Sequence, residues 1–118
     1  ATGFPDGHFD LVISHNMFHE VAAEHMLPVM QECHRLLSPG GVCIHQDVPT
    51  QENRLDPFMQ FVSAWQKDFN DEPFWMDYAQ ADLPALMVAA GFDDTAVRGD
   101  YIKAIDGPIP WYVVSAVR

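Results

Sequence analysis

"ECHRLLSPGGVCIHQDV", residues 32–48, contains two kinds of periodicity within one short stretch. In its first half and upstream of it, apolar side chains recur every three or four residues, which is typical of one face of an amphipathic helix; they are Met26, Leu27, Met30, Cys33, Leu36 and Leu37. Pro39 cannot continue a helix, and we expect Gly40 or Gly41 to close it in the left-handed conformation. The following run, Val42 to Asp47, predicts a strand.

The beginning of this helix is set by Pro28, which is tolerated in the first turn of a helix. We therefore expect the helix to begin near His25 or Met26. A second apolar run, Phe9 to Ser14 ("FDLVIS"), is rich in β-branched residues and predicts a strand covered on both faces, as in a parallel sheet.

Strand, helix, glycine-rich stop and strand form a βαβ unit, which predicts two parallel strands joined by a right-handed crossover. In open parallel sheets, ligands bind beyond the carboxyl ends of the strands. Here those ends are His15-Asn16 and Gln46-Asp47. We therefore expect any catalytic or ligand-binding residues to lie at this edge of the sheet.

The rest of the chain adds helices and a terminal pair of strands. Asp56 before Pro57 predicts a helix start, and its apolar face would carry Phe58, Phe61, Val62, Trp65 and Phe69. Asp82 predicts a helix over residues 83–90, closed by Gly91. Residues 95–105 and 111–117 predict two antiparallel strands. The sequence thus predicts one α/β domain over residues 1–118.

Composition excludes two classes of partner. Six Lys and Arg against 17 Asp and Glu give a formal charge of −11, and this argues against nucleic acid, whose binding needs clustered positive charge. The acidic surface serves either solubility or a cationic substrate. No apolar stretch is long enough to span a membrane, and no basic segment followed by an apolar run, the pattern of a signal peptide, is visible in this sequence, which opens at Ala1.

The cysteines and histidines predict neither a disulfide nor a metal site. Cys33 and Cys43 are ten residues apart, outside CxxC spacing, and we expect buried free thiols in a reducing cytoplasm. His19 and His25 are six apart and would lie on different helical faces, whereas a zinc-protease helix needs a spacing of four. His45 lies on a separate strand.

Three segments carry a resemblance to a known family: "FPDGHFDLVISHNMFHEV", "ECHRLLSPGGVCIHQDV" and "ALMVAAGFDD". They resemble the later motifs of class I S-adenosylmethionine-dependent methyltransferases, of the methyltransferase type 11 kind. The resemblance implies a partial Rossmann-like sheet, with two parallel strands, a C-terminal antiparallel hairpin and flanking helices. It also implies methyl transfer to a small molecule.

The sequence departs from this family at its beginning. Family members have a Gly-rich loop after their first strand, where the backbone approaches the cofactor closely, and a carboxylate after the second strand. Only eight residues precede Phe9, and none resembles that loop. The resemblance therefore implies the C-terminal half of a methyltransferase, and we expect this chain alone to bind S-adenosylmethionine weakly or not at all.

Two function classes stay open at this point. One is a methyltransferase that is active only when another chain supplies the missing half. The other is a non-catalytic module that binds a small molecule or a protein and self-associates.

The resemblance and the topology together select candidate site residues. His15 and Asn16 match family positions beside the methionine part of the cofactor, although a polar turn would look the same. His19 and Asp47 are candidates for the general base or for substrate orientation, because histidine titrates near neutrality and both would face one crevice. The structural alternative is a helix-start group and a strand-end cap.

Aromatic side chains after the helix that begins at Pro57 are candidates for substrate contact. Phe74, Trp75 and Tyr78 could form a lid over the substrate or part of the core.

The strand Phe9 to Ser14 would lie in the middle of a complete methyltransferase sheet and would have a free edge here. It carries no lysine, proline or bulge that would block pairing. The sequence therefore predicts a homodimer through this strand.

Overall fold

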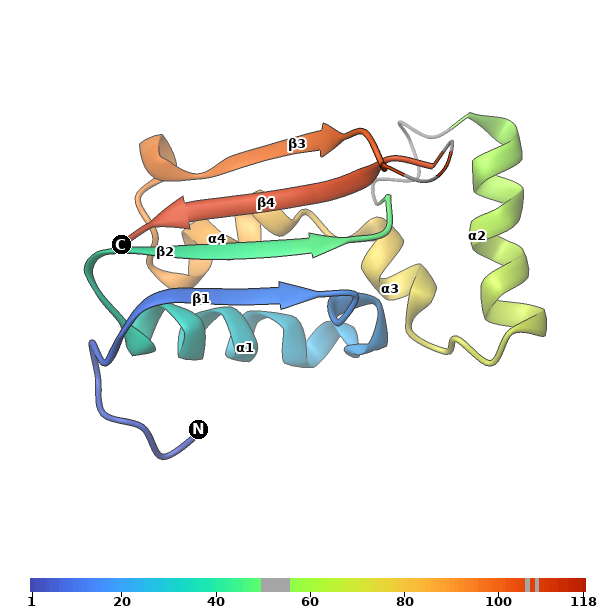
Figure 1. Ribbon diagram of the computed structural model, residues 1–118. Coiled ribbons are helices and arrows are strands. Elements are labelled where there is room, and N and C mark those ends of the chain that lie inside the picture. Colours follow the sequence, from blue (N-terminus) through green and yellow to red (C-terminus); the bar gives the residue numbers. More distant parts are fainter. Residues whose placement is uncertain (50–55, 106, 108) are drawn as a thin grey trace.

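The computed structural model describes residues 1–49, 56–105, 107 and 109–118, and these residues form an open four-stranded sheet with helices (Figure 1). Across the sheet the order is β1-β2-β4-β3. The strands are β1 (Phe9–His15), β2 (Leu37–Asp47), β3 (Arg98–Ile102) and β4 (Trp111–Val117). The predicted α/β class is confirmed.

Strand directions follow the sequence prediction. β1 pairs with β2 in parallel, with Leu11 opposite Val42 and His15 opposite Gln46. β4 is antiparallel to both β2 and β3, so the last two strands form the predicted antiparallel pair. The carboxyl ends of β1 and β2 therefore lie side by side at one edge of the sheet (Figure 1).

In the described part of the chain, four α-helices accompany the sheet: α1 (Ala23–Leu36), α2 (Pro57–Phe69), α3 (Trp75–Gln80) and α4 (Leu83–Ala90), with short 3₁₀ turns η1 (Phe18–Glu20) and η3 (Asp94–Ala96). Local sequence signals correctly predicted where α2 and α4 begin. The carboxylates of Asp56 and Asp82 accept hydrogen bonds from backbone amides in the first turns of α2 and α4, and Gly91 closes α4 with a φ of 115°.

Helix α1 begins earlier than predicted. It starts at Ala23, so Pro28 lies in its second turn rather than its first. Pro28 is exposed, and the carbonyl that loses its partner there can be hydrated. The tertiary packing of α1 outweighs the local preference of proline for a helix start.

Helix α1 also ends differently from the prediction. Its last residue is Leu36, and Leu37 is already extended and pairs with Phe9. Gly40 does adopt a positive φ, of 83°, but inside β2, where its amide donates to the carbonyl of Arg118. The glycine pair therefore forms an irregularity in the β1–β2 pairing and does not cap the helix.

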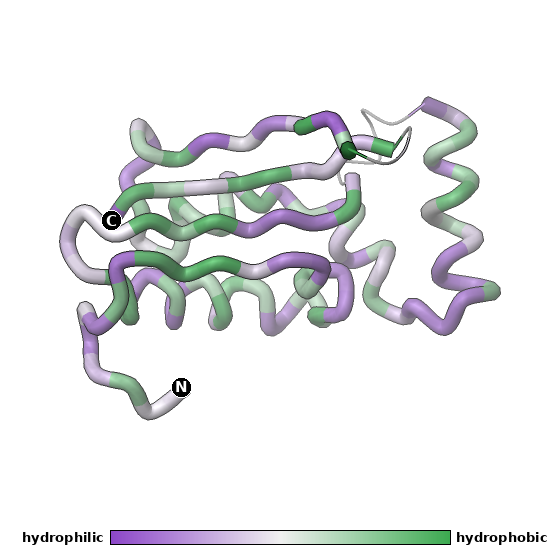
Figure 2. Tube along the Cα trace, viewed as in Figure 1, coloured by the Kyte–Doolittle hydropathy of each residue, from purple (hydrophilic) through white to green (hydrophobic). Residues whose placement is uncertain are grey.

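Among the described residues, helices cover one face of the sheet. Helices α1 and α4 lie together against that face (Figure 1), and the side chains pointing at them, such as Cys43 and Val114, are buried. On the opposite face Leu11 and Ile13 are 54% and 63% exposed, and the middle of β1 is apolar (Figure 2). The expectation that β1 is covered on both faces is wrong for the described residues.

The core lies between the sheet and the two helices. Its largest fully buried side chains include Phe18, Met30, Leu37 and Tyr78. Helix α2 contributes little to it, since it stands beyond the end of the sheet and packs mainly against α3 (Figure 1). The predicted aromatic face of α2 is solvent-exposed.

No helix in the described part of the chain is both long enough and apolar enough to cross a bilayer.

Candidate functional site

The carboxyl ends of β1 and β2 bring His19 and Asp47 together. Asp47 is the last residue of β2, and His19 lies in η1, directly after β1. Nδ1 of His19 is 2.6 Å from Oδ1 of Asp47, and both residues are buried. The two residues proposed from sequence for proton transfer thus form one hydrogen-bonded pair.

Asp47 also fixes the backbone that carries His19. Its Oδ2 accepts hydrogen bonds from the amides of Met17, Phe18 and His19, at 3.0, 2.8 and 3.3 Å. Its Oδ1 accepts a further one from the Val48 amide at 2.7 Å. The carboxylate thus both caps η1 and contacts the imidazole, so the predicted structural role of Asp47 at the strand end is present in the structure.

The two groups stabilise each other's charged forms. The hydrogen bond to Asp47 raises the pKa of His19 above 6.5; burial opposes this, and the charges of Asp47, Glu20 and Glu72 add to it. Burial favours neutral Asp47, but hydrogen bonds from His19 and from the Val48 and Phe18 amides hold the pKa of Asp47 below 3.8.

Since Nδ1 faces Asp47, the second ring nitrogen of His19 is the one directed away from the pair. Nε2 lies 3.7 Å from Oε1 of Glu20. A ring nitrogen of His19 and one carboxylate oxygen each of Glu20 and Glu72 all lie within 4.8 Å of one another. In neutral histidine this arrangement makes Nε2 the proton acceptor.

Two of the three predicted aromatic residues line the His19 site. The Trp75 and Tyr78 rings lie 5.3 and 6.4 Å from the imidazole. Tyr78 is fully buried and its hydroxyl donates to the Val48 carbonyl at 3.0 Å, so it supports the site from within the core. Phe74 is half-buried at the N-terminus of α3.

Two buried polar atoms beside His19 have no hydrogen-bond partner among the described residues. They are Nε1 of Trp75, a donor, and Oε2 of Glu72, an acceptor. Buried polar groups are normally paired. An unpaired donor and acceptor next to a proton-accepting nitrogen are features of a site that receives a polar ligand.

Comparisons with known proteins find similarity to methyltransferases and to polyketide synthases. Residues 1–45 match the model of a family described as a methyltransferase domain. The chain is 32% identical over 95 residues to an uncharacterized methyltransferase, sll0829, of Synechocystis, covering 80% of this chain and 42% of that protein. It is 31% identical over 110 residues to the highly reducing polyketide synthase lcsB of Purpureocillium lilacinum, covering 92% of this chain and 4% of that protein.

A solved structure shows the same fold. Phosphoethanolamine N-methyltransferase 2 of Haemonchus contortus, bound to phosphomonomethylethanolamine and S-adenosylhomocysteine, superposes with a TM-score of 0.64 at 12% identity. The match covers 98% of this chain and 35% of that one. The chain is a class I methyltransferase-like domain. It spans less than half the length of the curated relatives it matches.

The predicted cofactor residues of this methyltransferase-like domain lie at the same edge as the pair. His15 ends β1 and stacks at a tilt on Trp111, with ring centroids 5.0 Å apart. Asn16 has a φ of 51°, and its amide donates to the Gln46 carbonyl at 3.0 Å. Both side chains are exposed and make no hydrogen bond to another described residue. They are therefore open to a ligand.

An apolar cavity of about 320 Å³ opens beside them, lined by Val48, Pro49, Ala104, Gly107, Ile109, Pro110 and Trp111. Trp111 connects the cavity to His15, and Val48 connects it to Asp47. Small-molecule sites are commonly apolar hollows with a few polar groups at the rim. Trp111 and Glu72 could not be identified from the sequence, because their places at this site depend on long-range packing.

Proposed function

We propose that this chain carries the proton-transfer half of an S-adenosylmethionine-dependent methyltransferase that acts on a small molecule. The observation that carries the proposal is the buried hydrogen bond between His19 Nδ1 and Asp47 Oδ1 at the carboxyl ends of β1 and β2. A base held by a carboxylate at a ligand-binding edge is an arrangement suited to general-base catalysis.

In this mechanism, S-adenosylmethionine supplies an electrophilic methyl group. His19, neutral and with Nδ1–H directed to Asp47, takes the proton of the substrate nucleophile on Nε2. Asp47 keeps the imidazole in that tautomer and stabilises the imidazolium formed. Trp75 packs against the imidazole, and its unpaired Nε1–H can donate to a polar group of the substrate.

The residues present fit one part of the cofactor. We assign His15 and Asn16 to its methionine end, because both have exposed polar side chains at the carboxyl end of β1. Residues 1–8 contain no Gly-rich loop that would let the backbone approach the cofactor. Further polypeptide, supplied by another chain or by additional sequence, is then required for tight binding and turnover.

Exposed apolar surface supports the need for further polypeptide. β1 has no neighbour on its outer edge among the described residues. Leu11 and Ile13 of β1 are exposed. On α2, the side chains of Phe58, Phe61 and Phe69 are 63–73% exposed. We also place the protein in a reducing compartment such as the cytoplasm, because Cys33 and Cys43 are buried and free.

A chimera tests the proposal. Residues 1–118 would replace the matching part of the Synechocystis methyltransferase, and the product would be assayed for S-adenosylmethionine binding and for S-adenosylhomocysteine formation with O-, N- and acidic C–H acceptors. We expect His19→Ala to keep cofactor binding and to lower turnover by about 100-fold or more, the usual contribution of a general base. His25→Ala changes an exposed histidine on α1 and is the matched control.

Cofactor binding with turnover that His19→Ala leaves unchanged would show that the pair is structural. Binding without turnover on any acceptor would favour the alternative, a non-catalytic binding module.

A further inference from the structure

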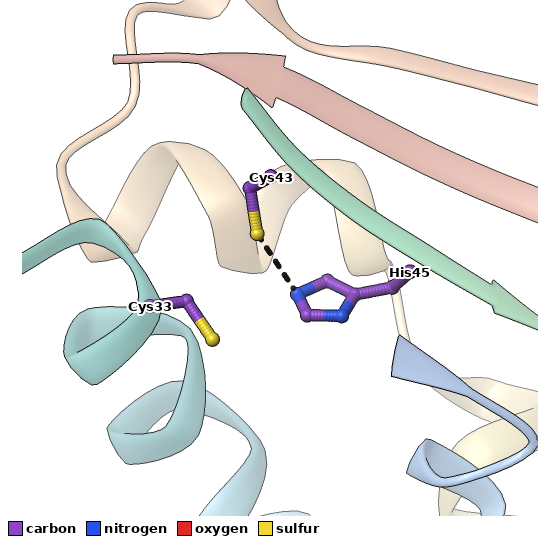
Figure 3. Close-up of side chains that lie close together, drawn as sticks. All are labelled: Cys33, Cys43 and His45. Carbon is purple, nitrogen blue, oxygen red and sulfur yellow. Dashed lines mark hydrogen bonds between the residues drawn. The ribbon is translucent and has the colours of Figure 1, made fainter. Parts of the chain in front are cut away.

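A second cluster of reactive side chains lies inside the core, away from the solvent-facing edge. Cys33 comes from the C-terminal part of α1, and Cys43 and His45 come from the buried face of β2 (Figure 3). The two sulfur atoms and a ring nitrogen of His45 all lie within 4.8 Å of one another. The exposed fractions of the three residues are 8%, 0% and 2%.

His45 presents the correct nitrogen to this cluster. Its Nδ1 is 2.7 Å from the Ser14 hydroxyl, which lies opposite it on β1, and its Nε2 is 3.3 Å from the Cys43 sulfur. In the tautomer that can bind a metal at Nε2, Nδ1–H donates to Ser14 Oγ and the thiol of Cys43 donates to Nε2, so both contacts are satisfied. The lone pair of Nε2 is then directed toward the two sulfur atoms.

We propose that Cys33, Cys43 and His45 form a binding site for one thiophilic divalent cation, for which Zn²⁺ is the best match. Two cysteines and one histidine are a ligand set that zinc uses, with bonds of about 2.3 Å to sulfur and about 2.0 Å to nitrogen. Tetrahedral bonds of this length hold two sulfur atoms roughly 3.8 Å apart. The spacing of the cluster is compatible with this after small side-chain adjustments.

Charge favours a divalent over a monovalent ion here. Zn²⁺ would displace one proton from each thiol, so that two thiolates and one dication leave the site neutral overall. A monovalent ion such as Cu⁺ would leave one net negative charge in an apolar core, which is costly. The Phe18 ring, 4.5 Å from that of His45, closes one side of the cluster.

The described residues offer three ligands and no fourth. The remaining coordination position would therefore take a water or a small thiol. The Ser14 hydroxyl would be a positioning group, because a hydrogen bond to the second ring nitrogen orients a metal-binding histidine.

Zinc loading of the 118-residue chain tests this proposal. The protein would be unfolded under reducing conditions and refolded with and without ZnCl₂, since a buried site is most readily filled during folding. After gel filtration, zinc would be counted by mass spectrometry, and its ligands would be identified by X-ray absorption at the zinc edge. We expect about one zinc per chain, bound by two sulfur atoms and at least one nitrogen.

Variants separate this site from adventitious binding by the acidic surface. Cys33→Ser and Cys43→Ser should each lower zinc affinity by roughly 100-fold or more, and Ser14→Ala by about 10- to 100-fold. His25→Ala, which removes an exposed histidine on α1, should leave the affinity unchanged. Circular dichroism of each variant checks that it is folded.

Two results would overturn the proposal. One is a refolded wild-type protein that retains no more zinc than Cys33→Ser. The other is an X-ray absorption spectrum of the bound zinc that shows nitrogen and oxygen ligands but no sulfur. This second result does not depend on whether any variant folds.

Discussion

Nδ1 of His19 and Oδ1 of Asp47 lie 2.6 Å apart although the two residues are 28 positions apart in the sequence. They meet because β1 and β2 are parallel neighbours, with His15 opposite Gln46, so both chains leave the sheet at the same edge. The fold therefore creates the pair, and the same carboxylate holds the 3₁₀ turn that carries the histidine.

The pair should make a pH-dependent contribution to stability. The pKa of His19 is raised above 6.5, so its contribution is complete below pH 6.5 and is lost as the pH rises through the raised pKa. The pKa of Asp47 is held below 3.8, so its contribution is complete above pH 3.8 and is lost as the pH falls through the lowered pKa. The stabilisation is greatest between these two values.

Asp47→Ala tests this contribution. It should lower the free energy of unfolding by about 3 kcal/mol near pH 5.5, because it leaves a buried histidine and backbone amides without their partner. Urea titrations at several pH values would measure the difference from wild type, which should shrink above the raised pKa of His19. Asp94→Ala, at an exposed position, is the control. A difference that does not vary with pH would contradict the charged pair.

Local signals in the sequence were sufficient for much of the fold. Asp82 and Gly91 delimit α4 as predicted, because a helix cap involves only neighbouring residues. The sequence also predicted the His19–Asp47 edge, since a βαβ unit brings strand ends together. It did not predict the end of α1, which is determined by the pairing of Leu37 with Phe9.

The cysteine cluster, like the end of α1, could not be predicted from local sequence signals. Cys33 and Cys43 were correctly predicted to be buried and free. Their proximity to His45 depends on how α1 packs across β2. The spacing of residues within one segment cannot predict this packing. A Cys-x-His pattern on one strand face, beside a helix with an inward cysteine, is the signal that could have indicated the cluster.

The chain alone should bind S-adenosylmethionine at millimolar affinity or weaker, which corresponds to a binding free energy no more favourable than about −4 kcal/mol. The physical reason is that His15 and Asn16 supply only one end of the site. Calorimetry with S-adenosylmethionine and S-adenosylhomocysteine measures this directly. A dissociation constant in the low micromolar range would contradict it, since about −8 kcal/mol would then come from part of a site.

The two glycines at the start of β2 should be sensitive to substitution for different reasons. Gly40 has a φ of 83° in open space, whereas a Cβ on Gly41 would lie 2.9 Å from the Ser38 carbonyl oxygen. We expect Gly40→Val and Gly41→Val each to cost roughly 1–3 kcal/mol of stability. Gly107→Val, at an exposed position with open space around it, should cost less than about 0.5 kcal/mol.

Chemical denaturation of the three variants gives these values. Unchanged unfolding midpoints for both β2 variants would contradict the described backbone.

The 118-residue chain should self-associate through the free edge of β1. Unpaired backbone groups along an apolar strand invite pairing with a second copy, and lysine on an edge strand opposes it. Ile13 is 63% exposed on β1 and Ile105 is 97% exposed in a loop. Ile13→Lys should therefore produce monomers, and Ile105→Lys should not. Sedimentation at tens of micromolar measures both, and a wild-type monomer under these conditions would contradict the prediction.

The measurement that tests the proposed general base most directly is the titration of His19 by NMR, with its ring protons assigned from the His19→Gln variant. We expect a pKa of His19 above 6.5 in the wild-type chain and a clear fall when Asp47→Asn removes the carboxylate. A wild-type pKa at or below 6.5, or one that Asp47→Asn leaves unchanged, would contradict this expectation.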